Sequence, residues 1–249
     1  MSGRVSSGPR PAPGRRPPVR GWFSLPTWLA VHGGLSLLWT VLLWVPSTRG
    51  AASVGVIAHG AAAFTVLMAG FGREAVRPAN AVTLLRLLLG LAALGMGLLR
   101  PALRGSAFIF AMLLAAELTD FLDGFLARRL GATPFGAIWD MEVDAYFMLL
   151  LSAVVVSFQG FAPWILLMGA MRYAFFFLFL PLPDVERPPA VFRWYAKAAC
   201  AAGAGTLVGI TFPFAGQRAK AVAGLVALSL LSVSFLWEAA LKLRRRGKP

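Results

Sequence analysis

The strongest constraint on this chain is a series of long apolar segments separated by proline and glycine. A helix crosses a bilayer with about 20 consecutive apolar residues, and prolines such as Pro46, Pro78 and Pro134 mark the segment boundaries. Eight candidate spans follow, at residues 25–46, 51–72, 80–99, 105–130, 134–158, 161–182, 191–213 and 219–240. Because backbone groups in lipid must be hydrogen-bonded internally, the pattern predicts an all-α, polytopic membrane helix bundle.

Composition supports a membrane protein. Hydrophobic residues make up 58% of the 249 residues, charged residues only 14%, and the mean hydropathy is +0.72. A soluble domain of this size could not cover itself with polar surface. Cys200 is the only cysteine, which excludes a disulfide within the chain. His32 and His59 lie on separate apolar segments, so we interpret both as packing or interfacial residues.

The net charge of +14 follows a topological pattern. If the N-terminus is cytoplasmic, the segments on that side hold 17 of the 24 Lys and Arg residues, as the positive-inside rule predicts. We therefore expect both termini in the cytoplasm, with a disordered basic tail at residues 1–21 and a second basic tail at residues 242–249. The same topology places the connection after Arg128 at the cytoplasmic face. A charge distributed in this way does not indicate a nucleic-acid partner.

Acidic residues are rare in this chain and concentrated in one region. Six of the ten lie between residues 117 and 144, and four of these are aspartates: Asp120, Asp123, Asp140 and Asp144. Ionised carboxylates at membrane depth are costly and are usually retained with a cation, a substrate or a proton path. The region is therefore a candidate functional site.

The spacing of the four aspartates predicts that they converge. Asp120 and Asp123 are three residues apart and Asp140 and Asp144 four apart, so each pair projects from one helix face. The pairs are also mirrored about residue 132, which places all four carboxylates roughly 12 to 18 Å from the turn of an antiparallel helix pair. Converging carboxylates repel one another unless hard cations lie between them. We predict two Mg²⁺ or Mn²⁺ ions at this point.

Small residues and an arginine accompany the aspartates. Gly124 and Ala127 lie on or beside the same helix face, and Gly136 precedes Asp140 by one turn. Small side chains leave room for a ligand, and Arg128 supplies a cation suited to a diphosphate. Taken singly, each residue also fits a simpler interpretation as a helix-packing glycine or an interfacial arginine.

Together these positions form a motif. The chain reads DFLDGFLAR from residue 120, then seven residues, Gly136, three residues, Asp140, three residues and Asp144. It resembles, without a gap, the signature DxxDGxxAR(x7)GxxxDxxxD of the CDP-alcohol phosphotransferase family. The resemblance implies a six-helix catalytic core, which we place at residues 76–241. Residues 22–75 would then form two additional N-terminal transmembrane helices.

The resemblance also implies an activity. An acceptor alcohol would attack the phosphorus of a CDP-linked lipid, such as CDP-diacylglycerol, and release CMP at a di-metal site near the cytoplasmic interface. Asp120, Asp123, Asp140 and Asp144 would bind the metals, and Asp144 would also be the general base. The residues implied to face the cytidine diphosphate are Asp120, Asp123, Gly124, Ala127, Arg128 and Gly136. Membrane lipids and a second copy of the chain, in a homodimer, are the other implied partners.

Two further groups are candidate site residues. Asn80, Thr83 and Arg86 are spaced three apart in a stretch that resembles the first core helix of the family. They are candidate supporting residues, although capping by Asn80 and snorkelling by Arg86 are alternatives. An anionic acceptor could be bound by Arg172, Arg193 and Lys197, although the last two also fit ordinary positive-inside flanking.

Two other functions remain open at this point. A cation- or proton-coupled transporter could use the intramembrane aspartates, but this function leaves the small residues and Arg128 unexplained. A catalytically silent scaffold would not need all four carboxylates. The identity of the acceptor alcohol does not follow from the motif, since several polyols and phosphorylated polyols suit the same core.

Overall fold

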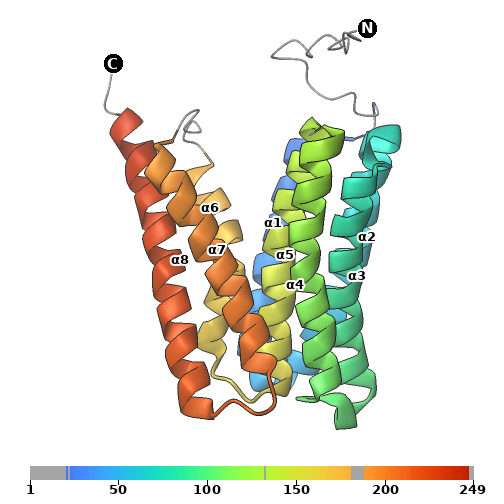
Figure 1. Ribbon diagram of the computed structural model, residues 1–249, viewed down its shortest axis with the longest axis vertical. Helices are drawn as coiled ribbons and strands as arrows, with labels where there is room; N and C mark the ends of the chain where they lie inside the picture. The colour runs from blue at the N-terminus through green and yellow to red at the C-terminus, as the bar shows by residue number, and fades with distance from the viewer. Residues whose placement is uncertain (1–20, 22, 132, 181–187, 247–249) are drawn as a thin grey trace, which may run out of the picture.

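The structure, a computed structural model, describes residue 21 and residues 23–131, 133–180 and 188–246, without the side chains of residues 73, 74, 127, 245 and 246. These residues form eight α-helices joined by short connections, with no strand among them (Figure 1). The helices are α1 (Leu25–Trp44), α2 (Arg49–Phe71), α3 (Pro78–Leu99), α4 (Ala107–Leu130), α5 (Pro134–Phe158), α6 (Leu166–Phe179), α7 (Ala190–Thr211) and α8 (Gln217–Arg246). Each predicted span overlaps one of them over most of its length, which confirms the all-α bundle.

The membrane assignment is also supported. Five helical segments of the described chain are long and apolar enough to cross a bilayer, and the shorter segment Pro163–Phe179 is apolar as well. Helix α4, which holds the first half of the acidic motif, is not among the five, because it carries Glu117, Asp120, Asp123, Arg128 and Arg129. The protein is therefore an integral membrane protein, and the helix that carries Asp120 and Asp123 is one of its less apolar helices.

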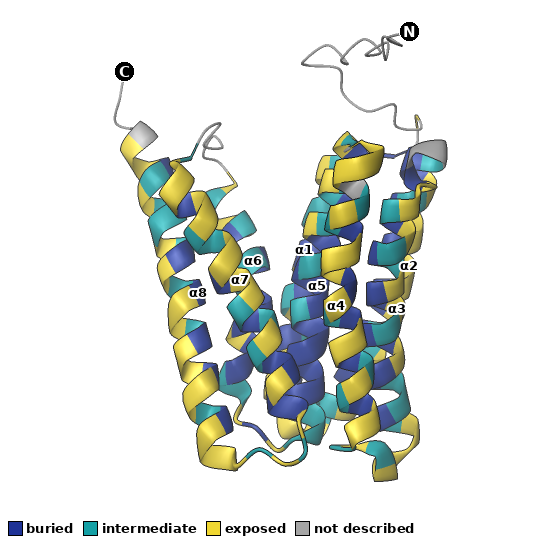
Figure 2. Ribbon diagram, in the orientation of Figure 1, coloured by how far each residue is buried: buried dark blue, intermediate teal, exposed yellow. Residues whose placement is uncertain are grey.

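Helix α5 is the centre of the bundle. Its core-facing residues are almost completely buried, and Figure 2 shows the lower half of this helix as a continuous buried stretch. It contacts α1, α2, α3, α6 and α7, whereas α3 packs mainly against α4 and α5. From Ala145 to Phe158 this helix carries no charged residue, and a helical segment that is apolar on all sides belongs inside a bundle. The two helices that pack closest to α3 are therefore the two that carry the aspartates.

The turn between α4 and α5 sets how these two helices meet. Gly131 ends α4 with a φ of +90°, a conformation that side chains disfavour. Thr133 caps α5, its hydroxyl accepting a hydrogen bond from the Gly136 N–H at 3.0 Å, and Pro134 occupies the first turn, where it needs no N–H partner. The three-residue connection reverses the direction of the chain, so α4 and α5 run antiparallel while each packs chiefly against α3.

The N-terminal helices dock on the core through buried polar groups. His32 of α1 and His59 of α2 contact each other, with Nδ1 and Nε2 3.1 Å apart. Tyr173 of α6 lies 3.4 Å from His32, and Tyr146 of α5 lies 3.4 Å from His59 and donates to the Val56 carbonyl. The two histidines are thus packing residues that meet in one network. Lipid tails are as apolar as the side chains of a helix, so apolar burial alone does little to hold two helices together in a bilayer. Hydrogen bonds of this kind therefore help to attach α1 and α2 to the core.

Two ends of the bundle can be distinguished. The start of α1, the turn between α4 and α5, and the end of α8 lie at the same end (Figure 1).

Helix α8 continues through Arg246, so the first five residues of the predicted basic tail at 242–249 are helical. Lys242 lies one turn after Glu238, with the ammonium 4.0 Å from the carboxylate, a spacing that supports a helix. Most of the predicted N-terminal tail at 1–21 lies outside the described residues.

The α5–α6 contact provides a test of the packing. A Cβ atom on Gly169 would lie 2.6 Å from the Leu149 Cα, too close for any rotamer to relieve. Gly169→Ala should therefore separate α5 from α6 and lower the free energy of unfolding by about 1–3 kcal/mol. The measurement is the thermal midpoint in detergent. Gly205→Ala on α7 is the matched control, because a Cβ there meets no atom within 4 Å, and an equal loss in both variants would contradict this account.

Candidate active site

Three carboxylates from α4 and α5 gather near the end of the bundle that holds their connecting turn. Asp120, Asp123 and Asp140 each offer one oxygen, and these oxygens lie within 4.8 Å of one another. Asp123 is buried, whereas the Asp120 side chain is half exposed. The convergence expected from the mirrored spacing is therefore present for three of the four predicted ligands.

The fourth aspartate joins this group through an arginine. Arg86 of α3 is fully buried, and its Nη1 donates to Asp144. Its Nη2 donates to Asp120 at 2.7 Å and to Asp123 at 2.6 Å. One guanidinium thus links α3 to carboxylates of both α4 and α5. Arg86 does not snorkel toward the membrane surface, and the alternative interpretation of this residue is wrong.

The other two supporting candidates are buried beside Arg86. The Thr83 hydroxyl donates to Asp123 Oδ2 at 2.9 Å, one helical turn before Arg86. The Asn80 amide donates to the Ala75 carbonyl at 3.2 Å, and its own backbone carbonyl accepts from the Trp139 indole. Asn80 does not cap α3, since the capping position is Arg77. The three-residue spacing therefore marks one helix face directed at the acidic cluster.

The donor atoms fit a hard divalent cation. Carboxylate oxygens are the ligands that Mg²⁺ and Mn²⁺ prefer. Asp140 Oδ1 is buried and has no hydrogen-bond partner among the described residues, an arrangement that is costly unless a further ligand satisfies the oxygen. Asp120 and Asp123 each have one oxygen bonded to Arg86, and the second oxygen of each carboxylate is available to a metal ion. The residues present are therefore compatible with a metal site.

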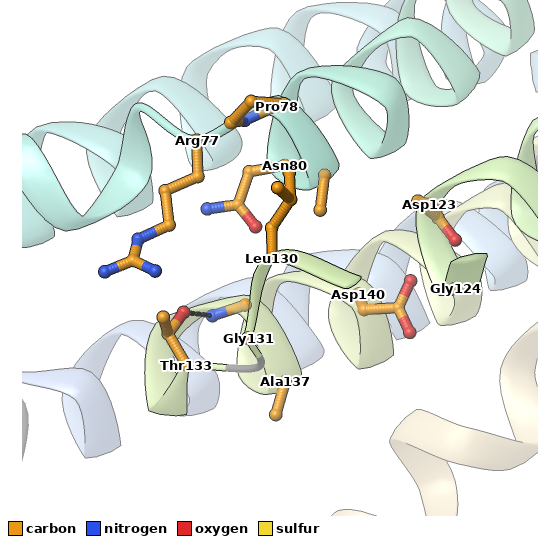
Figure 3. A pocket seen from close by; sticks show the side chains of 12 residues that line it. Arg77, Pro78, Asn80, Asp123, Gly124, Leu130, Gly131, Thr133, Ala137 and Asp140 are labelled. Atoms are coloured by element: carbon orange, nitrogen blue, oxygen red, sulfur yellow. Dashed lines mark hydrogen bonds between the residues drawn. The ribbon is translucent and has the colours of Figure 1, made fainter. Parts of the chain in front are cut away.

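A cavity of about 490 Å³ adjoins the carboxylates. It lies between the start of α3, the end of α4 and the start of α5 (Figure 3). The lining residues are Arg77, Pro78, Ala79, Asn80, Asp123, Gly124, Leu130, Gly131, Thr133, Gly136, Ala137 and Asp140. In the close-up, Asp123 and Asp140 stand at one end and Arg77 and Thr133 at the other. The two ends of the cavity therefore differ in charge, with carboxylates at one end and a guanidinium and a hydroxyl at the other.

The two motif glycines keep this cavity open. A Cβ on Gly136 would lie 3.1 Å from Thr133 Oγ1 and 3.2 Å from Asn80 Oδ1. A Cβ on Gly124 would meet only the Arg128 guanidinium, at 3.4 Å. Arg128 is exposed and is folded back over this glycine. The side chain of Ala127, also assigned to the nucleotide pocket, lies outside the described residues.

Two lining residues with polar side chains, Arg77 and Thr133, were not among the sequence candidates. Arg77 brings a cation to the end of the cavity away from the aspartates, and Thr133 brings a hydroxyl that is already bonded to Gly136. Arg77 directly precedes Pro78, and Thr133 directly precedes Pro134. A residue before a proline that opens a helix lies at a helix entrance, which is the sequence signal that could have identified both.

The three predicted acceptor-binding residues are divided by the structure. Arg172 donates to the buried Glu142 at 2.9 Å, on the face of α5 opposite the aspartates, beside Leu29 of α1. Lys197 of α7 is exposed and close enough to Asp140 for their charges to attract. Arg193, one helical turn earlier, is also exposed. Of these three basic residues, only the two on α7 lie on the same helix.

Comparison with known proteins agrees with this geometry. A family model described as CDP-alcohol phosphatidyltransferase matches residues 77–242, which is more than half of the chain and runs from the start of α3 into α8. No curated protein and no solved structure matches the chain. The match includes every aspartate of the cluster, the cavity lining and Arg86. The resemblance drawn from the motif is confirmed, and the chain belongs to the CDP-alcohol phosphatidyltransferase family.

Proposed function

We propose that this protein transfers a phosphatidyl group from a CDP-linked lipid, such as CDP-diacylglycerol, to an acceptor alcohol in phospholipid synthesis. The observation that carries the proposal is the 490 Å³ cavity whose one end is formed by Asp123 and Asp140. A cytidine diphosphate needs room for its nucleoside and a countercharge for its phosphates, and cations held by these carboxylates would supply that charge. Family membership favours transfer over the transporter function that the aspartates alone left open.

Two divalent cations, Mg²⁺ or Mn²⁺, are part of this proposal. Asp120, Asp123, Asp140 and Asp144 would hold them, and when bound they would neutralise the diphosphate and polarise the reacting phosphorus. The unpartnered Asp140 Oδ1 supports this assignment. Phosphoryl transfer depends mainly on positioning and charge stabilisation, which rigid helices supply better than loops.

Asp144 is the proposed general base. Its side chain is 48% exposed, more accessible than the buried Asp123, and it lies one turn after Asp140. The acceptor oxygen forms a bond to phosphorus, the bond from phosphorus to the CMP oxygen breaks, and the acceptor proton passes to the Asp144 carboxylate. Arg86 donates to one oxygen of this carboxylate, which leaves the second oxygen to accept the proton.

The nucleotide would lie over the small residues of the motif. Gly124 and Gly136 clear the cavity, and Arg128 stands beside Gly124 with an exposed guanidinium that can pair with phosphate. Ala127 belongs to the same assignment through the motif. Arg77 lines the end of the cavity away from the aspartates, where its guanidinium would donate to the cytosine ring.

Helix α7 is the proposed side of entry for the acceptor. Lys197 lies near Asp140, and Arg193 is on the same face one turn away, so an anionic alcohol would meet two cations beside the reacting carboxylates. Arg172 is bonded to Glu142 on the face of α5 opposite the aspartates, so it is not part of this proposed entry. The stretch from Arg193 to Lys197 lacks the Lys-Thr and following Gln that the resemblance associates with glycerophosphate, so the acceptor alcohol stays open.

The proposed orientation places this site near the cytoplasmic face, with both termini on that side of the cell membrane. The shared position of the α4–α5 turn and the end of α8 supports one common face (Figure 1). The excess of Lys and Arg in these segments supports the cytoplasmic side. A homodimer is proposed from the family resemblance alone.

The direct test is CMP release. Purified protein with Mg²⁺ and CDP-diacylglycerol should release CMP only when a suitable alcohol is present, because the acceptor supplies the attacking oxygen. A panel of polyols and phosphorylated polyols, with lipid products identified by mass spectrometry, names the acceptor. Folded protein that releases no CMP from CDP-linked donors with any acceptor would refute the proposal.

Substitution of two aspartates separates metal binding from proton transfer. Asp144→Asn should bind Mn²⁺ more nearly normally than Asp123→Asn, because Asp123 belongs to the compact group of three oxygens and Asp144 does not. Turnover in Asp144→Asn should nevertheless fall by about a hundredfold or more, since the general base is removed. Metal affinity and CMP release are measured on the same samples. Normal turnover in Asp144→Asn would eliminate it as the base.

The cavity can be blocked without touching a charge. Gly124→Leu should fill the space beside Asp123 and weaken binding of CDP by about tenfold or more, because the nucleotide and the new side chain compete for one volume. Binding of CDP is measured by calorimetry. Gly209→Leu on α7 is the control, since no atom lies within 4 Å of a Cβ at that position. Equal CDP affinity in the two variants would place the nucleotide elsewhere.

A further inference from the structure

Arg86 is a buried cation enclosed by the acidic cluster. Its residue exposure is 2%, and it bonds to Asp120 and Asp123 of α4 and to Asp144 of α5. No other ion pair to these carboxylates occurs in the part of the chain that the structure describes. The guanidinium therefore stands where four like charges would otherwise repel one another across two helices.

The charges make this position significant. An arginine stays ionised in proteins, so Arg86 contributes a permanent positive charge. A buried ion pair is weak evidence for stability, but removing one partner from a buried pair is strongly destabilising, because it leaves uncompensated charge. Without divalent cations, Arg86 is the chief source of charge compensation for these carboxylates, above all for the buried Asp123.

The bonds also divide the carboxylate oxygens. Arg86 occupies Asp120 Oδ1, Asp123 Oδ2 and Asp144 Oδ1, and Thr83 donates to the same Asp123 oxygen. One oxygen of each of these three residues remains for another ligand. Asp140 makes no bond to Arg86, and its buried Oδ1 has no hydrogen-bond partner within the part of the chain that the structure describes. Arg86 thus holds these carboxylates from the α3 side and leaves their remaining oxygens available to a metal ion.

We propose that Arg86 is a resident counter-cation: it keeps the α4 and α5 carboxylates assembled before divalent cations bind, and its charge weakens the affinity for those cations. Arg86 is a positioning residue in this role, because it acts through Asp120, Asp123 and Asp144. The inference rests on the metal site of the proposed function. It adds that the affinity of that site is set by a residue of α3, outside the aspartate motif.

Two consequences follow for Arg86→Gln. Without divalent cations, the variant should unfold at a lower temperature than the original protein, because the carboxylates have lost their counter-cation. With Mn²⁺, its affinity should rise by about tenfold or more, since the positive charge that opposes the ion is gone. The stabilisation by Mn²⁺ should therefore be larger in the variant than in the original chain.

The experiment measures thermal midpoints in EDTA and across a Mn²⁺ titration, with free Mn²⁺ followed by electron paramagnetic resonance. Neither readout depends on turnover. Arg100→Gln, the same charge change at the exposed far end of α3, is the control and should leave both quantities unchanged. Arg86→Lys keeps the charge but loses the three-way bonding, so it should lower the midpoint in EDTA while leaving the Mn²⁺ affinity near normal.

The outcomes separate this inference from the proposed function. A loss of stability in Arg86→Gln that is equal with and without Mn²⁺ would mean that Arg86 only packs α3 against α4, and would overturn the inference while the metal site stands. If Arg86→Gln does not fold, Arg86→Lys decides: an unchanged midpoint in EDTA would refute the role. Absence of Mn²⁺ binding by the original protein would overturn both proposals.

Discussion

Repulsion among carboxylates that share a small volume inside an apolar bundle is the constraint on which the site depends. Asp120, Asp123 and Asp140 bring oxygens within 4.8 Å of one another, where like charges interact strongly if the surroundings exclude water. The protein answers this with Arg86, which bonds to both helices that carry the aspartates. Stability and cation binding at this site are therefore two aspects of one electrostatic balance.

That balance requires α3, α4 and α5 to be held at close range. The short turn with Gly131 and Thr133 connects α4 to α5, while the Asn80–Trp139 and Thr83–Asp123 hydrogen bonds attach α3 to α5 and α4 respectively. The same three helices surround the cavity. Recognition of a ligand and assembly of the carboxylates are consequently built on one rigid unit, which favours positioning of the reacting groups.

The two N-terminal helices support this unit indirectly, through their contacts with α5. They lie outside the segment matched by the family, yet α1 and α2 contact α5. The hydrogen bonds of His32 and His59 with Tyr173 and Tyr146 reach the face of α5 that does not carry the aspartates. Since Glu142 and Arg172 form their ion pair on that side as well, the added helices cover polar groups that lipid would not tolerate.

Much of the fold and of the site could be predicted from local pattern. Apolar length and proline positions predicted one helix in each of eight segments, because a chain in lipid has few other ways to satisfy its backbone. The spacing of Asp120, Asp123 and Asp140 on two helices with a short connection was enough to predict their convergence. In both cases the information lies in helical periodicity, which neighbouring residues determine.

Other features were decided only when distant segments packed together. Whether Arg86 snorkels or turns inward depends on α4 and α5, which follow it by dozens of residues, and the contact between His32 and His59 depends on how α1 and α2 face the core. The division of Arg172 from Lys197 likewise follows from the opposite sides of α5 that they approach. The sequence by itself determined the helices, the acidic cluster and the family motif, because these are local. Only the tertiary structure decided which charges meet, since partners for buried ions come from whichever helices pack beside them.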